Sequence, residues 1–360
     1  MKMTVSTKKL QELMNKALKC AICKPKIIIS GMMAISLKDG VLTLIASDGN
    51  NYLYVSEDCE GDDFYVVVDV PLFSKLISKL TCDNITMKVV NDSLEIDGNG
   101  HYVIGLPYDG EGELVKFPDP RQKLTNEANN TMLKLSTLKM IVATAKASVD
   151  FTADYEGCYS GYYMGPECVV TTDSFKVCWI DVGLFKTPII VRRDTMDLIQ
   201  FLSDEEVSVV NDGKYIIFNT SKCTIFAQLI DSVSDFRVDA VKQYITSEFA
   251  QTCTVSKADL MQVLDRLSLF VATVDENGIF LAFGQDELKI NSRQSDGEEV
   301  IEYAERVDGE QYACCLDIVK FGEQVKSVLS DSVTICYNNP NAVKIEDGNV
   351  TKIVSLFAED

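Results

Sequence analysis

The sequence predicts an α+β protein of three tandem domains, each with two helices packed on antiparallel sheets. At 360 residues, the chain exceeds the length at which a single core keeps growing. An apolar helical stretch followed by two alternating strands occupies residues 68–98 and recurs at 315–348, with a weaker copy at 189–221. Because the copies lie roughly 120 residues apart, they indicate duplicated domains rather than a solenoid of short repeats.

Another helical pattern precedes each of these copies. It begins near Thr4, Leu133 and Thr254, each time after a short extended lead and a Ser or Thr suited to cap a helix. In the first domain its apolar face comprises Leu10, Leu13, Met14, Ala17, Leu18 and Ala21. Alternating strands with Asp-Gly turns follow, so each domain is expected to consist of strand, helix, strands, and then strand, helix, strands again.

Two polar connections divide the chain. Residues 107–130 are rich in Pro, Gly and acids, and a second polar stretch runs from about Asp231 to Thr252. These connections predict domains at 1–120, 121–245 and 246–360.

Composition favours a cytoplasmic protein without a cofactor. No apolar run reaches the length of a membrane span, and charges interrupt the start of the chain. Most of the twelve cysteines stand singly in apolar patterns, so we expect free thiols. Cys20 and Cys23 form a CxxC pair, but no second pair or nearby His completes a zinc site, which favours a structural role.

The sequence offers little for catalysis. It contains no Walker-type loop, GxGxxG, GxSxG or HExxH motif, and its single histidine, His101, lies in a strand pattern where we expect it to face solvent. The acidic run at residues 56–63 lacks the spacing of a calcium loop and is interpreted as a solvated hairpin tip. We therefore expect no enzyme, although a thiol-dependent enzyme and a structural tandem-domain protein stay open as alternatives.

Positive charge is concentrated on a few helices despite a net charge of −20. Residues 6–26 carry six lysines and one acid, residues 70–80 add Lys75 and Lys79, and residues 131–147 carry three lysines and no acid. The other helices are near neutral, since Arg192, Arg193, Lys257, Arg266, Lys320 and Lys326 are offset by nearby acids. Amphipathic helices commonly place lysine on their wet side, but this segregation also suits a phosphate-binding surface.

Three segments resemble a known family. "TTDSFKVC" at 171–178 is similar to an "ATDGHRLA" segment, "SDFR" at 234–237 to a "PDYR" segment, and residues 265–281 to the start of a third domain, all of the bacterial-type DNA polymerase sliding clamp, the beta subunit. The resemblance extends over essentially the full chain. Ser174 replaces Gly, Phe175 replaces His, Ser234 replaces Pro, and the C-terminus "VSLFAED" departs from the family tail, which indicates a divergent member of host or phage origin.

The resemblance implies a homodimeric ring with helices inside and sheets outside, each chain forming half. Such a ring encircles duplex DNA regardless of sequence and tethers the replicative polymerase, which binds, like the clamp loader, through a short peptide. Combined with the helix charge, it predicts these DNA-binding residues: Lys8, Lys16, Lys19, Lys24, Lys75, Lys79, Lys139, Lys146, Arg192 and Arg193.

The same resemblance assigns two protein-binding sites. The partner-peptide pocket is expected to comprise Thr172, Ser174, Phe175, Lys176, Val177, Phe236, Arg237, Val238, Val354, Ser355, Leu356 and Phe357. The dimer interface is expected to comprise Leu76, Leu80, Tyr102, Leu269 and Phe270. For the apolar members, burial inside their own domain is the alternative.

Overall fold

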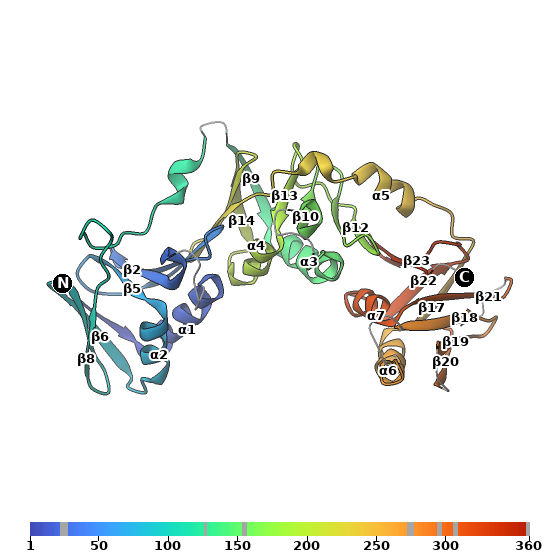
Figure 1. The fold of residues 1–360 in the computed structure, drawn as a ribbon, viewed down its shortest axis with the longest axis horizontal. Helices are drawn as coiled ribbons and strands as arrows, with labels where there is room; N and C mark the ends of the chain where they lie inside the picture. Colours follow the sequence, from blue (N-terminus) through green and yellow to red (C-terminus); the bar gives the residue numbers. More distant parts are fainter. Residues whose placement is uncertain are drawn as a thin grey trace. The chain divides into compact units, whose positions relative to one another are not determined.

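The computed structural model describes residues 1–21, 28–125, 128–152, 157–271, 277–293, 297–304 and 309–357 (Figure 1). The chain divides into two compact units. The first unit comprises Met1–Lys139 and Asp194–Leu229, and the second comprises Met140–Arg193 and Ile230–Asp360. Helices and antiparallel sheets occur in both, which confirms the predicted α+β class.

The first unit contains an eight-stranded and a four-stranded antiparallel sheet. The larger sheet has the order β5 (Phe64–Asp69), β2 (Met32–Lys38), β3 (Val41–Ser47), β4 (Asn51–Asp58), β16 (Cys223–Gln228), β15 (Tyr215–Asn219), β14 (Glu206–Asn211) and β9 (Asn129–Lys134). The smaller sheet has the order β1 (Lys2–Ser6), β6 (Asn84–Val90), β7 (Ser93–Asp97) and β8 (His101–Gly105).

Helices cover these sheets through the apolar faces that the sequence predicts. Helix α1 (Thr7–Ala17) packs on β3 and β4 and lies beside α2 (Val70–Lys79). It buries Leu10, Leu13, Met14 and Ala17, while Leu18 and Ala21 are half-buried. Helix α4 (Arg193–Leu198) falls almost wholly within this unit, and α3 (Leu135–Ala145) begins here and ends in the second unit.

The second unit repeats this plan. Its larger sheet has the order β13 (Ile189–Arg192), β10 (Gly161–Met164), β11 (Val169–Thr172), β12 (Lys176–Ile180), β24 (Val350–Ser355), β23 (Ala342–Asp347), β22 (Ser332–Tyr337) and β17 (Gln251–Ser256). The smaller sheet has the order β20 (Glu298–Glu302), β19 (Glu287–Ser292), β18 (Gly278–Phe283) and β21 (Tyr312–Asp317). Helices α6 (Lys257–Ser268) and α7 (Ile318–Lys326) lie side by side.

Each eight-stranded sheet joins strands from two consecutive predicted domains, through β4 with β16 and through β12 with β24. This continuity explains why the compact units cut across the predicted domains, whose boundaries stay a prediction.

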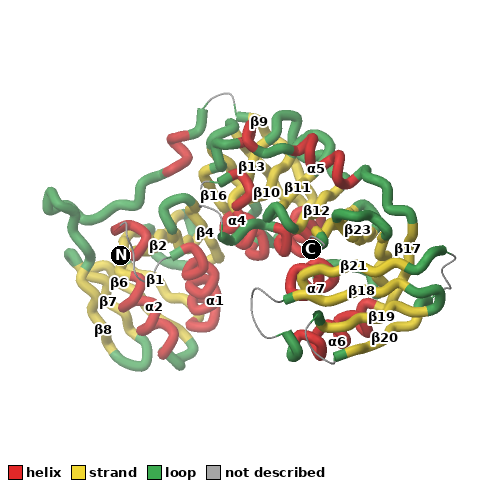
Figure 2. Tube along the Cα trace, turned by 45° about the vertical axis from the view of Figure 1, so that its right-hand side comes forward, coloured by secondary structure: helices red, strands yellow, loops and turns green. Residues whose placement is uncertain are grey.

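The two polar connections follow β8 and β16 as long segments with short helices (Figure 2). In the first unit Val115, Phe117 and Leu124 pack on the apolar surface of the larger sheet. In the second unit α5 (Val238–Ile245) occupies the corresponding place, with Val238 and Val241 packed on the sheet.

Candidate DNA-contacting and partner-binding surfaces

The predicted DNA-binding lysines that the structure describes are exposed. Lys8 and Lys16 lie on α1 opposite its buried face, and Lys19 lies in the short helix Leu18–Cys20 that follows α1. Lys75 and Lys79 lie on α2 opposite its buried face. Lys139 of α3 and Lys146, which follows α3, are exposed as well. Lys24 lies outside the described residues. Each described lysine can therefore approach a phosphate, and the lysines of the first unit are carried by regular helices.

The two predicted arginines are different. Arg192, the last residue of β13, is 1% exposed, so it cannot reach a phosphate, and its prediction is wrong. Arg193 is half-buried, donates to the Asp150 carbonyl at 2.9 Å and lies over the Phe151 ring. The sequence pattern assigned Arg192 to a helix surface, but Arg192 is the last residue of β13, and the strand directs its side chain into the core.

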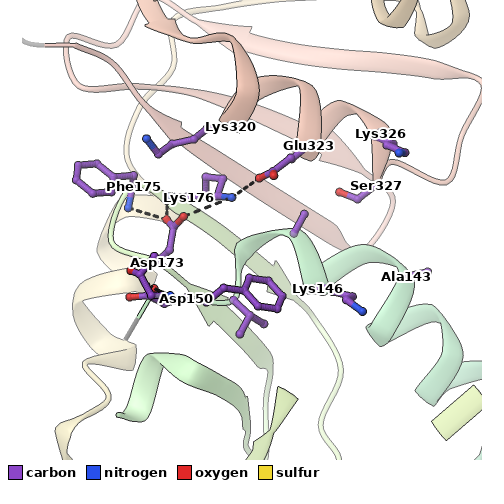
Figure 3. A pocket seen from close by; sticks show the side chains of 14 residues that line it. Ala143, Lys146, Asp150, Asp173, Phe175, Lys176, Lys320, Glu323, Lys326 and Ser327 are labelled. Atoms are coloured by element: carbon purple, nitrogen blue, oxygen red, sulfur yellow. Dashed lines mark hydrogen bonds and ion pairs between the residues drawn. The ribbon is translucent and has the colours of Figure 1, made fainter. Parts of the chain in front are cut away.

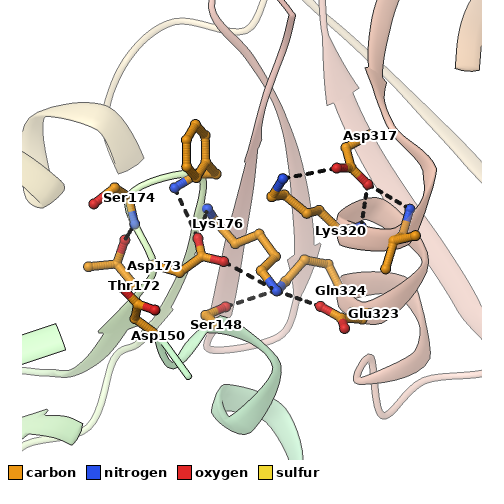
Figure 4. Close-up of polar contacts among 12 residues, drawn as sticks. Ser148, Asp150, Thr172, Asp173, Ser174, Lys176, Asp317, Lys320, Glu323 and Gln324 are labelled. Atoms are coloured by element: carbon orange, nitrogen blue, oxygen red, sulfur yellow. Dashed lines mark hydrogen bonds and ion pairs between the residues drawn. The ribbon is translucent and has the colours of Figure 1, made fainter. Parts of the chain in front are cut away.

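A tight turn between β11 and β12 presents the segment that resembles the family motif. Oδ1 of Asp173 accepts hydrogen bonds from the amides of Phe175 and Lys176 at 2.9 and 2.6 Å (Figure 4). Ser174 takes the left-handed conformation, with φ 75°. The turn projects Phe175, which is 58% exposed, and Lys320 of α7 places its Nζ 4.8 Å from the ring centre.

Behind this turn lies a polar network centred on the buried Lys176. Lys176 is only 6% exposed, and its Nζ contacts Glu323 Oε2 at 2.5 Å and Asp173 Oδ2 at 3.4 Å (Figure 4). Next to it, Gln324 of α7 donates to the Ser148 hydroxyl at 2.9 Å. These bonds hold α7 against the turn and against the residues that follow α3.

The segments predicted for the partner pocket meet where β12 and β24 pair. Lys176 lies opposite Val354, and the Ser355 amide donates to the Phe175 carbonyl at 2.9 Å. Opposed residues of antiparallel strands share a face, and neighbours along a strand alternate faces. Val354 joins the core beneath α6 and α7, whereas Val177 packs with Phe236 and Val238 on the α5 side. The predicted set is therefore split between two faces of the sheet.

Burial narrows this set further. Thr172, Lys176, Phe236 and Val354 are buried, so they can shape a binding site but offer little contact area. Ser174, Phe175 and Arg237 are exposed, while Val177, Val238, Ser355, Leu356 and Phe357 are half-buried.

A cleft of about 840 Å³ lies beside the turn, between the end of α3 and α7. Lys320 and Phe175 lie toward one end of it, and Lys146 and Lys326 toward the other (Figure 3). We call it the α3–α7 cleft. Of the predicted pocket residues it contains only Phe175 and Lys176. Sequence reasoning missed Lys320, Glu323 and Lys326 here because opposite charges that nearly cancel along one helix resemble any solvated surface.

The predicted dimer residues are unequal in exposure. Leu269 and Phe270, after α6, are 82% and 51% exposed, and Leu76 and Tyr102 are half-buried. Leu80 is 4% exposed and is removed from the set, because it ends the buried face of α2.

Both four-stranded sheets offer an edge strand. Within the described residues, β1 and β21 add isolated bridges to Gly61 and Leu356 inside their own units, while β8 and β20 form the other edges. Val103 of β8 and Val300 of β20 are 58% and 45% exposed. Unpaired backbone groups along such strands are templates for pairing with another chain.

The thiols and the histidine show no catalytic arrangement among the described residues. The eleven described cysteines are free, and burial raises the pKa of Cys20 and Cys178. His101 is exposed on β8 and contacts Asp97, as expected for a solvent-facing strand residue. The described side chains form no group of metal-binding residues, and none of the described helices could span a membrane.

The fold is that of the bacterial DNA polymerase III beta subunits, the sliding clamps, which confirms the fold that the sequence resemblance implies. No family model matches the chain, and no curated protein matches it in sequence.

Particular solved structures match from end to end. The Bartonella birtlesii sliding clamp bound to griselimycin has a TM-score of 0.85 at 15% identity, with 100% of both chains covered. The beta subunit from the DNA polymerase of Streptococcus pyogenes has 0.84 at 15%, and the Bacillus subtilis sliding clamp 0.84 at 16%, again with 100% of both chains covered.

Proposed function

We propose that this protein is a DNA sliding clamp: a non-enzymatic processivity factor that encircles duplex DNA and tethers a replicative polymerase. The observation that carries the proposal is the full-length fold match to bacterial clamps, with TM-scores of 0.84 and 0.85. The chain would comprise three clamp domains, 1–120, 121–245 and 246–360, and form half of a ring.

The exposed helical lysines support the DNA role. Phosphate contacts carry no sequence information, so a lysine-lined channel holds any duplex and lets it slide. The acidic remainder of the chain would discourage adsorption to DNA outside the ring.

Charge reversal tests this role. Replacing Lys8, Lys16, Lys75 and Lys79 with Glu should reduce retention on nicked circular DNA by at least tenfold. The matched control carries the same change of charge at exposed lysines outside these helices, Lys38, Lys116, Lys186 and Lys214. Equal loss in both variants would show that total charge, and not a channel, governs retention.

We further propose a head-to-tail homodimer in which β8 of one copy pairs with β20 of the other. Antiparallel pairing of β4 with β16 and of β12 with β24 already builds two eight-stranded sheets in each chain. The same arrangement across two copies would complete a third type of eight-stranded sheet and place Val103 against Val300.

Sedimentation tests the dimer. Val103→Asp combined with Val300→Asp should give monomers, as should charged residues at Leu269 and Phe270. Val90→Asp, at an exposed valine of β6, is the control and should leave the dimer intact. A dimer that survives both sets of changes would overturn the assignment.

Partner binding would centre on the β12–β24 junction and the exposed Phe175. The polymerase and the loader would each insert a short peptide with a few apolar anchors. Because Phe175 adds an aromatic ring and Lys320 a charge at this turn, we expect weak binding of a standard bacterial clamp-binding peptide. Phe175→His should tighten that peptide at least threefold in calorimetry, whereas no change would place the site elsewhere.

The alternative of a thiol enzyme has less support. The thiolate is the nucleophile, and burial raises the pKa of Cys223, Cys253 and Cys314 to about 12. Retention on circular DNA after alkylation of the accessible thiols would exclude this alternative.

A further inference from the structure

A lysine and a cysteine face each other inside the second unit. Lys352 of β24 and Cys178 of β12 are direct partners across the antiparallel pair, and both are 0% exposed. The Lys352 Nζ lies 3.7 Å from the Cys178 Sγ and donates to the Thr144 carbonyl of α3 at 2.5 Å. A buried amine thus touches one backbone oxygen and one thiol.

The fold does not require this pair. In the first unit, the turn between β3 and β4 has the same hydrogen bonds as the turn between β11 and β12, which matches the two sheets residue by residue. At the matched positions Leu53 of β4 lies opposite Ile225 of β16, and both are 0% exposed. Two aliphatic side chains fill that place, so the lysine and the thiol are a departure specific to the second unit.

We propose that Lys352 and Cys178 form a covalent N–O–S bridge when the protein is exposed to dioxygen. The amine and the thiol each lose hydrogen, new N–O and O–S bonds form, and the second oxygen atom leaves as water. Dioxygen takes four electrons, two from nitrogen and two from sulfur. The oxidant is a small apolar molecule, which suits a site closed to larger reagents.

The surroundings favour this chemistry over simple oxidation of the thiol. The two reacting atoms, the Lys352 Nζ and the Cys178 Sγ, are already in contact in a core that is closed to water. Stepwise oxidation to sulfinic or sulfonic acid would place a larger and more polar group in a closed core. A single oxygen atom bonded to both the neighbouring nitrogen and the sulfur instead gives a neutral link.

The bridge would fasten the sheet at its central pair. Cys178 and Lys352 are 174 residues apart in sequence, and β12 and β24 are the strands through which two predicted domains share one sheet. A covalent bond between these strands would hold them together even when the hydrogen bonds between β12 and β24 break. The bridged form should therefore be more stable to unfolding than the reduced form.

Intact-mass and peptide mass spectrometry test the proposal on the full-length protein. Aerated protein should contain a linked pair of tryptic peptides heavier by about 14 Da than their sum, one oxygen gained and two hydrogens lost. Trypsin should no longer cleave after Lys352, and dithiothreitol should restore both mass and cleavage. Protein prepared without oxygen should lack the link.

Variants separate the bridge from folding. Cys178→Ser and Lys352→Arg should each abolish the 14 Da link, whereas Cys336→Ser, at a buried cysteine of β22, should retain it. If an aerated, folded wild type shows no link, or a mass loss of about 2 Da that indicates a direct S–N bond, the N–O–S assignment is wrong.

Discussion

The turn between β3 and β4 and the turn between β11 and β12 have the same backbone hydrogen bonds but different side chains. Asp48 accepts the amides of Asn50 and Asn51 at 2.9 and 2.7 Å, just as Asp173 accepts those of Phe175 and Lys176. In each turn the residue after the aspartate is left-handed, Gly49 at φ 103° in the first unit and Ser174 in the second.

The side chains around the two turns then diverge. Asn51 is buried and neutral, bonded to Asp48 and to Thr195 of α4, whereas the matched Lys176 is charged and contacts Glu323 of α7. The first turn carries Asn50 where the second projects Phe175. The aspartate alone forms the hydrogen bonds that define this hairpin turn, so the residues after it can differ. In the second unit these residues are an exposed phenylalanine and a charged lysine.

The largest test of this difference places a lysine in the first unit. Ile225→Lys should destabilise the protein by about 3–5 kcal/mol, because Leu53 offers it no polar partner in a closed core. Ile225→Met, of similar volume, should cost less than about 1.5 kcal/mol. Urea denaturation followed by circular dichroism measures both stability losses. Equal losses would show that the first unit accommodates a lysine at this position as well as the second unit does.

A smaller difference is expected at the two buried polar residues of the turns. Asn51→Ala should cost about 1–3 kcal/mol, because it leaves the Thr195 hydroxyl and Asp48 without their partner. Lys176→Met should cost less than about 1 kcal/mol, since the half-exposed Glu323 carboxylate can return to water and Asp173 keeps its bonds to the two amides of the turn. A larger loss for Lys176→Met would mean that the charged network, and not the aspartate turn, stabilises the second hairpin.

Exchanging the left-handed residues should have opposite effects. Gly49→Ser should destabilise the first turn by about 1 kcal/mol, because a side chain is disfavoured at positive φ. Ser174→Gly should stabilise the second turn by about 0.5 kcal/mol, since the relief of strain is partly offset by the flexibility of glycine in the unfolded chain. Differential scanning calorimetry would reveal shifts of the same sign if the turns did not correspond.

Alkaline pH should destabilise both units, and the second by a somewhat larger amount, because burial raises the pKa of Cys20, Cys59 and Cys223 in the first unit and of more described thiols in the second. Burial raises the pKa of Cys178 in the second unit, and that of Cys253 and Cys314 to about 12. A raised folded pKa gives stability that is complete below the unfolded value of about 8.5 and is lost as the pH rises toward the folded value. The loss at pH 8.5 is about 0.4 kcal/mol per thiol.

Trp179, the single tryptophan, lies in β12 and reports the second unit by fluorescence. The urea concentration at its unfolding midpoint should decrease as the pH is raised from 7.5 to 9. Cys253→Ala should make that decrease smaller. A midpoint that rises with pH would contradict the sign of these shifts.

The sequence predicts local features of this fold better than distant ones. The predictions of the buried face of α1 and of the two polar connections agree with the structure, because both depend on spacing and composition within a few residues. The pairing of β4 with β16 was not predicted, since no local pattern specifies a partner strand so far away. The α3–α7 cleft was missed for the same reason, because its lysines come from segments that only the fold brings together.

The sheet shared by distant strands also constrains the order of events during synthesis. Lys222 pairs with Glu57 across 165 residues, so β4 is made long before its partner strand emerges from the ribosome. Until then its edge is open, and such edges can pair wrongly with other nascent chains. We therefore expect the N-terminal half of the chain to complete its folding only after residues 223–228 have been synthesised. Slowing translation before residue 223 should increase the dependence of the nascent chain on chaperones.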